Sequence, residues 1–283
     1  MSMEMRKVAL GVLVLLSGCA SSRFAAPGAA LQESVALESP AGRFRIDYAP
    51  GQEQDAARVQ QAVTEALPRL ERWGTLREPV TIKVMPDHAS LEAAVRARGF
   101  DWLRAWSRYD KVFVQAPSTW GAAGATQPQI NELLLHELTH SVMYQMAADR
   151  RTNKEIPLWF REGMASYTAE QSYRWVSLEE IARHFERTPG SDPVRRPGDL
   201  YRDDSNLIYG VAHHAFAFLV KRYGEDAVRG VLREMDGGKE FPRAFENAIG
   251  LAPDAFERDF TRYVRWRGFR GGRVTPGASA PPG

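Results

Sequence analysis

The sequence predicts an α+β fold, with a small N-terminal αβ lobe that contains a mixed sheet and a C-terminal all-helical lobe. Stretches in which apolar and polar residues alternate, as in half-buried strands, end before residue 126. From there to residue 266 the apolar residues recur at helical spacing. Of the 283 residues, 44% are apolar and 25% charged, a balance that excludes collagen, coiled coil and long disorder for most of the chain.

The αβ lobe is expected to alternate strands with helices. Its first strand covers 44–48, where apolar side chains alternate with polar ones. A helix over 53–73 follows, which we expect Pro68 to bend or interrupt, because proline lacks the N–H that a helix needs. The remaining elements are strands at 80–84 and 111–115 and a short helix over 90–98 that Ser90 caps.

The second lobe is expected to be helical throughout, and no strand pattern returns in it. No linker separates it from the first lobe, so we treat 43–126 and 127–266 as two lobes of one domain over 43–266. Helices are expected at 128–147, 157–171, 177–186, 206–223, 225–235, 241–249 and 253–266.

The N-terminus has the pattern of an export signal. Two basic residues precede a short apolar run over 8–16, which is too short to span a bilayer and is typical of a secretory signal peptide. The run ends in Leu-Ser-Gly-Cys, which resembles a bacterial lipoprotein box. The resemblance implies a signal peptide over 1–19 and a lipid on Cys19; the alternative is an ordinary signal peptide with an incidental cysteine.

The segments that flank the domain are expected to be unstructured. Small residues, Pro and Gly predict a flexible tether over 20–42 and a disordered tail over 267–283. By resemblance to the lipoprotein sorting rule, Ala20 and Ser21 after the cysteine imply the outer membrane. The protein is therefore expected in the cell envelope, lipid-anchored and facing the periplasm.

Charge and cysteine content exclude other classes of protein. With 37 basic and 35 acidic residues, a net charge of +2 and no basic stripe, the chain gives no sign of nucleic-acid binding. One cysteine excludes an internal disulfide framework and any zinc site with two or more cysteine ligands.

The most informative motif is His-Glu-Leu-Thr-His at 136–140, which has the H-E-x-x-H pattern. The surrounding helix has an apolar ridge from Ile130 to Met146, and His136 and His140 form a separate ridge, so their imidazoles can converge on one ion. Two imidazoles and one carboxylate suit Zn²⁺ and leave a fourth position for water. Glu137 can reach that water without being a ligand.

The third ligand is expected on the next helix. Pro157 suits a first helical position, and Glu162 follows about one turn into that helix. The small residues Gly163, Ala165 and Ser166 come next, and we expect them to let this helix approach its neighbour closely enough for the carboxylate to reach the ion.

The two segments together resemble the gluzincin metallopeptidases of the thermolysin-like clan, and the bacterial peptidase MA-like domains in particular. The resemblance joins the motif at 136–140 to Trp-Phe-Arg-Glu-Gly-Met-Ala at 159–165, and implies a zincin-like fold. It implies that His136, His140 and Glu162 are zinc ligands. It also implies that Glu137 is the general base that activates the zinc-bound water and later protonates the leaving amine.

Two departures from the clan matter. Thermolysin-type enzymes place an Asp four residues after the ligand Glu to orient a ligand His, and Ser166 stands there in this chain, so the orienting group must come from elsewhere. The Gly-x-Met-Glu-Asn motif of the large aminopeptidases is absent from the sequence, so that activity is not predicted.

Residues further along the chain could complete the site. The resemblance favours Tyr209 as the donor to the oxyanion, with His213 as the alternative, while a third interpretation has Tyr209 pack in the core. In zincins an edge strand binds extended substrate, so the strand over 111–115 is either that edge or an interior strand. Most of the nearby tryptophans are expected in the core, with Trp120 a candidate for lining the cleft; they are Trp102, Trp106, Trp120, Trp159 and Trp175.

These observations predict a zinc metallopeptidase that hydrolyses peptide bonds in the cell envelope. Its expected partners are a peptide or protein substrate and the membrane, through the lipid on Cys19. The alternative is a noncatalytic zinc-binding envelope lipoprotein with a binding or assembly role. Glu137 argues against that alternative, because a purely structural metal needs no base beside it.

Overall fold

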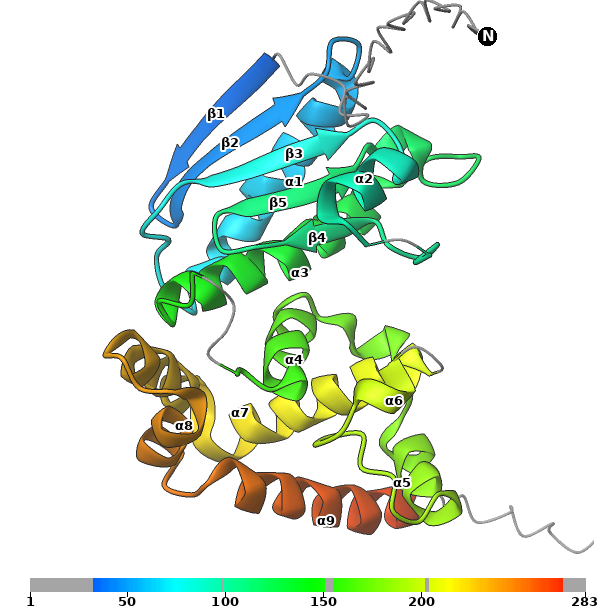
Figure 1. Ribbon diagram of the computed structural model, residues 1–283, viewed down its shortest axis with the longest axis vertical. Coiled ribbons are helices and arrows are strands. Elements are labelled where there is room, and N and C mark those ends of the chain that lie inside the picture. Colours follow the sequence, from blue (N-terminus) through cyan, green and yellow to red (C-terminus); the bar gives the residue numbers. More distant parts are fainter. Residues whose placement is uncertain (1–32, 98, 151–154, 202–203, 272–283) are drawn as a thin grey trace, which may run out of the picture.

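The computed structural model describes residues 33–97, 99–150, 155–201 and 204–271 (Figure 1). The predicted signal peptide, Cys19 and the first part of the predicted tether lie outside the described residues. Within the described ranges no helix is both long and apolar enough to cross a membrane.

A five-stranded mixed sheet forms the N-terminal part of the fold, as predicted. Its order is β1-β2-β3-β5-β4, with the two outer strands antiparallel to their neighbours and the three inner ones parallel to one another. The strands are β1 (Glu33–Ser39), β2 (Gly42–Tyr48), β3 (Val80–Met85), β4 (Ala105–Ser107) and β5 (Lys111–Gln115).

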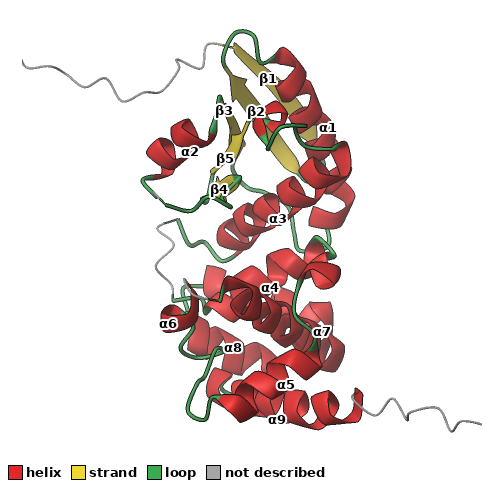
Figure 2. Cartoon of the chain, turned by 90° about the vertical axis from the view of Figure 1, so that its right-hand side faces the viewer, coloured by secondary structure: helices red, strands yellow, loops and turns green. Residues whose placement is uncertain are grey.

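Helices cover both faces of this sheet. The short helix α2 (His88–Val95) lies on one face, and α1 (Glu53–Leu70) and α3 (Gln127–Met146) lie on the other (Figure 2). Buried aliphatic side chains of β2, β3 and β5 pack against α1 and α3, while a small separate cluster under α2 includes Leu91 and Leu103. The long helix α3 therefore lies between the sheet lobe and the rest of the protein.

The rest of the chain is helical, so the α+β class is confirmed. Its elements are α4 (Leu158–Thr168), α5 (Leu178–Arg187), α6 (Gly198–Tyr201), α7 (Ser205–Asp236), α8 (Phe241–Ile249) and α9 (Pro253–Gly271), with 3₁₀ turns η1 (Pro117–Thr119) and η2 (Gln171–Arg174). The α7 helix breaks at Gly224, whose φ of 80° suits glycine, and the sequence predicts that break between 223 and 225. Aromatic rings around Trp159 and Phe216 fill the centre of this lobe.

Buried and ionic contacts join the two lobes. The Trp73 indole donates a buried hydrogen bond of 2.8 Å to Thr168 Oγ1. Beyond the break at Gly224, Arg229 donates to the backbone carbonyl of Arg72, and Arg72 pairs with Glu225. A single apolar core cluster runs through both lobes.

Two short strands were not predicted. The β1 strand occupies the second half of the segment expected to be a tether over 20–42, so that expectation is wrong for residues 33–42. Only Val35 and Leu37 pack inward, and the apolar Ala36 is exposed between them, which weakens the alternating pattern. With three residues, β4 is too short to show any periodicity.

Three helix boundaries also differ from expectation. Pro68 does not interrupt α1 but lies within its last turn, and the helix ends two residues later at Leu70. Asp87 caps α2 in place of Ser90, its carboxylate accepting from the Ser90 backbone N–H at 2.7 Å. The α9 helix continues to Gly271, so residues 267–271 of the expected disordered tail are helical.

Candidate metal centre

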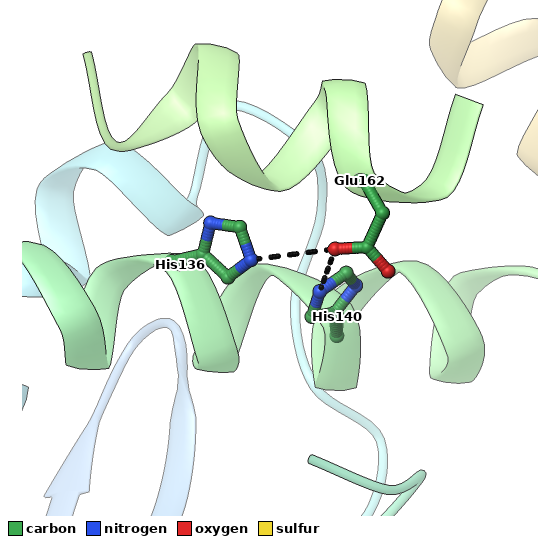
Figure 3. A group of neighbouring side chains, drawn as sticks. All are labelled: His136, His140 and Glu162. Atoms are coloured by element: carbon green, nitrogen blue, oxygen red, sulfur yellow. Dashed lines mark ion pairs between the residues drawn. The ribbon is translucent and has the colours of Figure 1, made fainter. Parts of the chain in front are cut away.

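Three predicted ligands converge between two neighbouring helices (Figure 3). His136 and His140 lie one turn apart on α3, and Glu162 reaches them from α4. Glu162 Oε2 is 3.6 Å from Nε2 of His136 and 3.4 Å from Nε2 of His140. All three side chains are buried, and their ligand atoms lie within 4.8 Å of one another.

The site holds its histidines inside the protein because α3 is packed on two sides. The ridge that begins at Ile130 and Leu134 is buried against α1 and the sheet, as its spacing predicts. The opposite ridge with the two histidines faces α4. Helix α3 is therefore buried around most of its circumference, and the imidazoles lie in a low-dielectric environment.

Gly163 and Ser166 of α4 face a different helix from the one expected. A Cβ on Gly163 would lie 2.6 Å from Phe216 Cβ and closer still to the Ala212 carbonyl, both on α7. Ser166 also faces α7, where its hydroxyl hydrogen-bonds His213 Nδ1 at 2.9 Å. The small face of α4 thus allows close packing on α7, which leaves Glu162 directed at α3.

Gln171 is the group that orients His136, and sequence reasoning missed it. Its Oε1 lies 2.9 Å from His136 Nδ1, and its Nε2 donates to Glu132 Oε1 at 2.9 Å. Because the amide nitrogen is used by Glu132, Oε1 accepts from His136 Nδ1–H, which leaves the lone pair of Nε2 directed at Glu162. Glu132 is in turn paired with Arg174 at 2.9 Å.

The electrostatics of the site favour an ionised carboxylate. Burial alone would raise the pKa of Glu162, but the nearby imidazoles of His140 and His136 hold the pKa well below its ordinary 4.5. Arg161 Nε donates to the second oxygen of Glu162 at 3.1 Å. That contact leaves Oε2 as the oxygen that faces both histidines.

The donor set and its spacing fit zinc. Tetrahedral zinc with bonds of about 2.0–2.1 Å to nitrogen and oxygen places its ligands about 3.3 Å apart. The two measured separations from Glu162 Oε2, 3.4 and 3.6 Å, are close to that value. Two neutral imidazoles and one carboxylate are also the ligand set of many catalytic zinc sites, which keep one position open.

Glu137 lies beside the three ligands but is not one of the group. Its Oε2 accepts a hydrogen bond from the Ser107 hydroxyl on β4. It is buried, yet it lines two hollows that meet at the metal centre, one of about 220 Å³ and one of about 600 Å³. A carboxylate placed there can exchange protons with a molecule bound in either hollow.

The two candidate donors differ in position. Tyr209 lines both hollows, with its ring stacked on Trp175 at 5.1 Å. His213 is buried, lines neither hollow and is held by Ser166. This arrangement supports Tyr209 over His213, although the role of either residue in catalysis stays a prediction.

A second tyrosine, which the sequence did not suggest, also faces the smaller hollow. Tyr144 follows His140 by one turn and lines the hollow beside it. Burial raises the pKa of Tyr144 to about 12, so its hydroxyl keeps its proton at neutral pH.

The edge of the sheet beside the site is β4, and not the strand over 111–115. The β5 strand lies between β3 and β4, so it is an interior strand. All three residues of β4 line the smaller hollow. The outer side of β4 is therefore the place where an extended chain could add to the sheet.

Most of the tryptophans expected in the core line the hollows instead. Trp159 is fully buried, as expected. Trp120 lines the larger hollow, as expected, and the other three also face one or both cavities; they are Trp102, Trp106 and Trp175. Their spacing in sequence gave no sign of this, because an aromatic residue at a cavity wall and one in the core have the same local pattern.

Comparison with known proteins places the chain in a family. The sequence model of the Peptidase MA superfamily matches residues 71–266. An uncharacterized protein of Bacillus subtilis (strain 168), YhcO, is 25% identical over 131 residues, which is 46% of this chain and 40% of that protein.

Two solved structures match the chain with low identity and low TM-scores. An M1 zinc metallopeptidase from Deinococcus radiodurans has a TM-score of 0.40 and 16% identity, over 89% of this chain and 52% of that one. An aminopeptidase N family protein from Idiomarina loihiensis has a TM-score of 0.39 and 12% identity, over 82% and 42%. The chain spans about half the length of these relatives, or less. The segment matched by the family model covers more than half of the chain and includes His136, Glu137, His140 and Glu162, and the chain belongs to the Peptidase MA superfamily.

Proposed function

We propose that this protein is a zinc-dependent metallopeptidase that hydrolyses peptide bonds in the cell envelope. The observation that carries the proposal is the place of Glu137. It stands outside the ligand group of His136, His140 and Glu162, yet it lies where two hollows meet beside that group. A metal with a purely structural role needs neither an adjoining cavity nor a buried carboxylate directed into it.

Each residue of the site has a role in this reaction. Zinc held by the two histidines and Glu162 would supply a Lewis acid that polarises the peptide carbonyl and makes water more acidic. Glu137 accepts the proton of the attacking water and passes it to the leaving amine. The Ser107 hydroxyl, which donates to Glu137 Oε2, fixes the direction of that carboxylate. The Tyr209 hydroxyl donates a hydrogen bond to the developing oxyanion.

The edge strand offers a way to hold the substrate. An extended peptide that pairs with β4 through main-chain hydrogen bonds would lie along the smaller hollow and past Glu137. Ser107 belongs to that strand and contacts Glu137, so substrate pairing and base orientation involve the same three residues.

The test measures zinc content and cleavage on one preparation. Purified protein should bind about one zinc per chain and cleave an unstructured protein such as reduced casein. Glu137→Gln should retain the zinc and lose cleavage, whereas Glu186→Gln, an exposed glutamate, should keep both. If the wild type and Glu137→Gln both bind a full zinc per chain and neither cleaves any of a broad set of substrates, the noncatalytic binding role is favoured.

The lipid anchor is a separate part of the proposal, and the lipoprotein box at Cys19 supports it. Cells fed an alkyne-tagged fatty acid should label the wild-type protein and not Cys19→Ser. The labelled protein should sediment with outer-membrane vesicles. Labelling of the serine variant would contradict attachment at this residue.

A further inference from the structure

The larger hollow beside the metal centre is walled by aromatic rings from both lobes. It begins at His136 and Glu137 and has a volume of about 600 Å³. The αβ lobe contributes Trp102 and Trp120, and the helical lobe contributes Tyr173, Trp175 and Tyr209.

Two of these rings are exposed to an unusual degree. Trp102 is 51% exposed and Tyr173 is 74% exposed. In the part of the chain that the structure describes, one other large apolar side chain is exposed, Trp266 at 50%, and it lies away from both hollows. Exposed aromatic rings that gather at one cavity mark a binding surface, because a ligand covers them.

The polar atoms of three of these rings are already bound within the protein. Trp120 Nε1 donates to the Gln115 carbonyl at 2.9 Å, and Trp175 Nε1 donates to Ser166 Oγ at 2.7 Å. The Tyr173 hydroxyl donates to Glu132 Oε2. These three rings therefore offer the hollow their faces and edges, and not their hydrogen-bond donors.

The charged groups that line the hollow are also partnered. Glu132 is paired with Arg174 at 2.9 Å, and Glu137 accepts from Ser107. Arg104 donates to the backbone carbonyl of Asp101 at 2.7 Å. An aromatic guest needs only the ring surfaces and leaves these contacts intact.

We infer that, given the proposed peptidase function, the larger hollow binds an aromatic side chain of the substrate close to the scissile bond, against Trp102 and Tyr173. The closeness to the bond follows from His136 and Glu137, which line the same hollow. The smaller hollow has a volume of about 220 Å³ and shares Trp102 with the larger one, but Tyr173 lines only the larger one, so the preference is assigned to the larger hollow.

Peptide binding tests this inference without requiring turnover. The probes are fluorescein-labelled peptides, blocked at both ends, that carry Phe, Leu or Ala at one central position in a Gly/Ala background. Their binding to full-length, detergent-solubilised Glu137→Gln protein is measured by fluorescence anisotropy. The Phe peptide should bind at least about tenfold more tightly than the Ala peptide and measurably more tightly than the Leu peptide.

Variants assign the preference to the two exposed rings. Trp102→Ala and Tyr173→Ala in the same background should each weaken binding of the Phe peptide by about twofold to tenfold, with little effect on the Ala peptide. Trp102→Phe should restore part of the loss. Trp266→Ala, which removes an equally exposed tryptophan outside the hollows, should leave every affinity unchanged.

The outcomes separate this inference from the proposed function. Equal binding of the Phe and Leu peptides, or equal losses in Trp266→Ala and Trp102→Ala, would overturn the inference. Cleavage sites mapped with wild-type protein give the second readout. Cleavage without aromatic preference overturns the inference and leaves the peptidase function intact, whereas aromatic-selective binding without cleavage supports the inference and contradicts the peptidase function.

Discussion

Removal of the Gln171 side chain should weaken zinc binding although Gln171 is not a ligand. In Gln171→Ala the 2.9 Å hydrogen bond to His136 Nδ1 is lost, and the buried ring N–H loses its acceptor. Leaving such a group unpaired costs about 1–3 kcal/mol. The same change frees the imidazole to rotate, and loss of comparable contacts typically weakens metal binding by about tenfold to a hundredfold, or roughly 1.4–2.7 kcal/mol.

The assay is competition for zinc against a chromophoric chelator, with circular dichroism to confirm that the variant is folded. Gln61→Ala, which removes an exposed glutamine from α1, is the control and should leave the zinc dissociation constant unchanged. A dissociation constant for Gln171→Ala within twofold of the wild type would refute the orienting role.

A charge-swap series tests the direction of the hydrogen bonds. Gln171→Glu keeps an acceptor for His136 but places a second carboxylate against Glu132, where the amide now donates at 2.9 Å. Repulsion between the two carboxylates should therefore displace the group that orients His136 and weaken zinc binding in Gln171→Glu. Adding Glu132→Gln restores a donor and acceptor pair, and it should recover most of the affinity.

Further predictions concern the third ligand, the oxyanion donor, pH and packing. Glu162→Ala should lower zinc content measured by mass spectrometry, and unchanged content would mean that the third ligand is another residue. Tyr209→Phe should lower kcat by about a hundredfold with KM little changed, and an unaltered kcat would remove it from catalysis. Burial, and to a smaller extent the neighbouring His214, lowers the pKa of His213 from its ordinary 6.5 to about 4, so between these values the unfolded chain binds a proton that the folded chain does not. The free energy of unfolding should therefore fall by up to about 3 kcal/mol as the pH drops from 6.5 to 4, and urea titrations should show His213→Asn losing this part of the pH dependence. Gly163→Ala should destabilise the fold by about 1–3 kcal/mol in the same titration, because its methyl group would collide with α7, while Gly198→Ala, with open space around it, should cost little.

Elements with a periodic pattern of apolar residues could be predicted from the sequence. Apolar spacing located the long helices α1, α3 and α7, and it separated the ridge of His136 and His140 from the apolar ridge of α3. The two helices expected at 206–223 and 225–235 leave out Gly224, where α7 breaks. The structure brings the three proposed ligands together, as the motif and the following helix predict.

What the sequence did not reveal depends on contacts between distant segments. Gln171 lies nine positions after Glu162 in a 3₁₀ turn, and no local pattern links it to a histidine 35 residues earlier. The edge strand β4 was missed because three residues are too few to show an alternating pattern. The contact of Ser107 with Glu137 was missed for the same reason. The exposure of Trp102 and Tyr173 likewise depends on how the two lobes meet.

The apolar core shared by the two lobes limits where the chain can be truncated. The segment that matches the superfamily begins at residue 71, after β1, β2 and α1. A fragment starting there would leave β3 without its parallel neighbour β2, and it would strip α1 from the buried face of α3. We therefore expect autonomous folding to need a boundary before Glu33, and truncations between residues 33 and 70 should yield aggregation-prone chains and not a smaller folded protein.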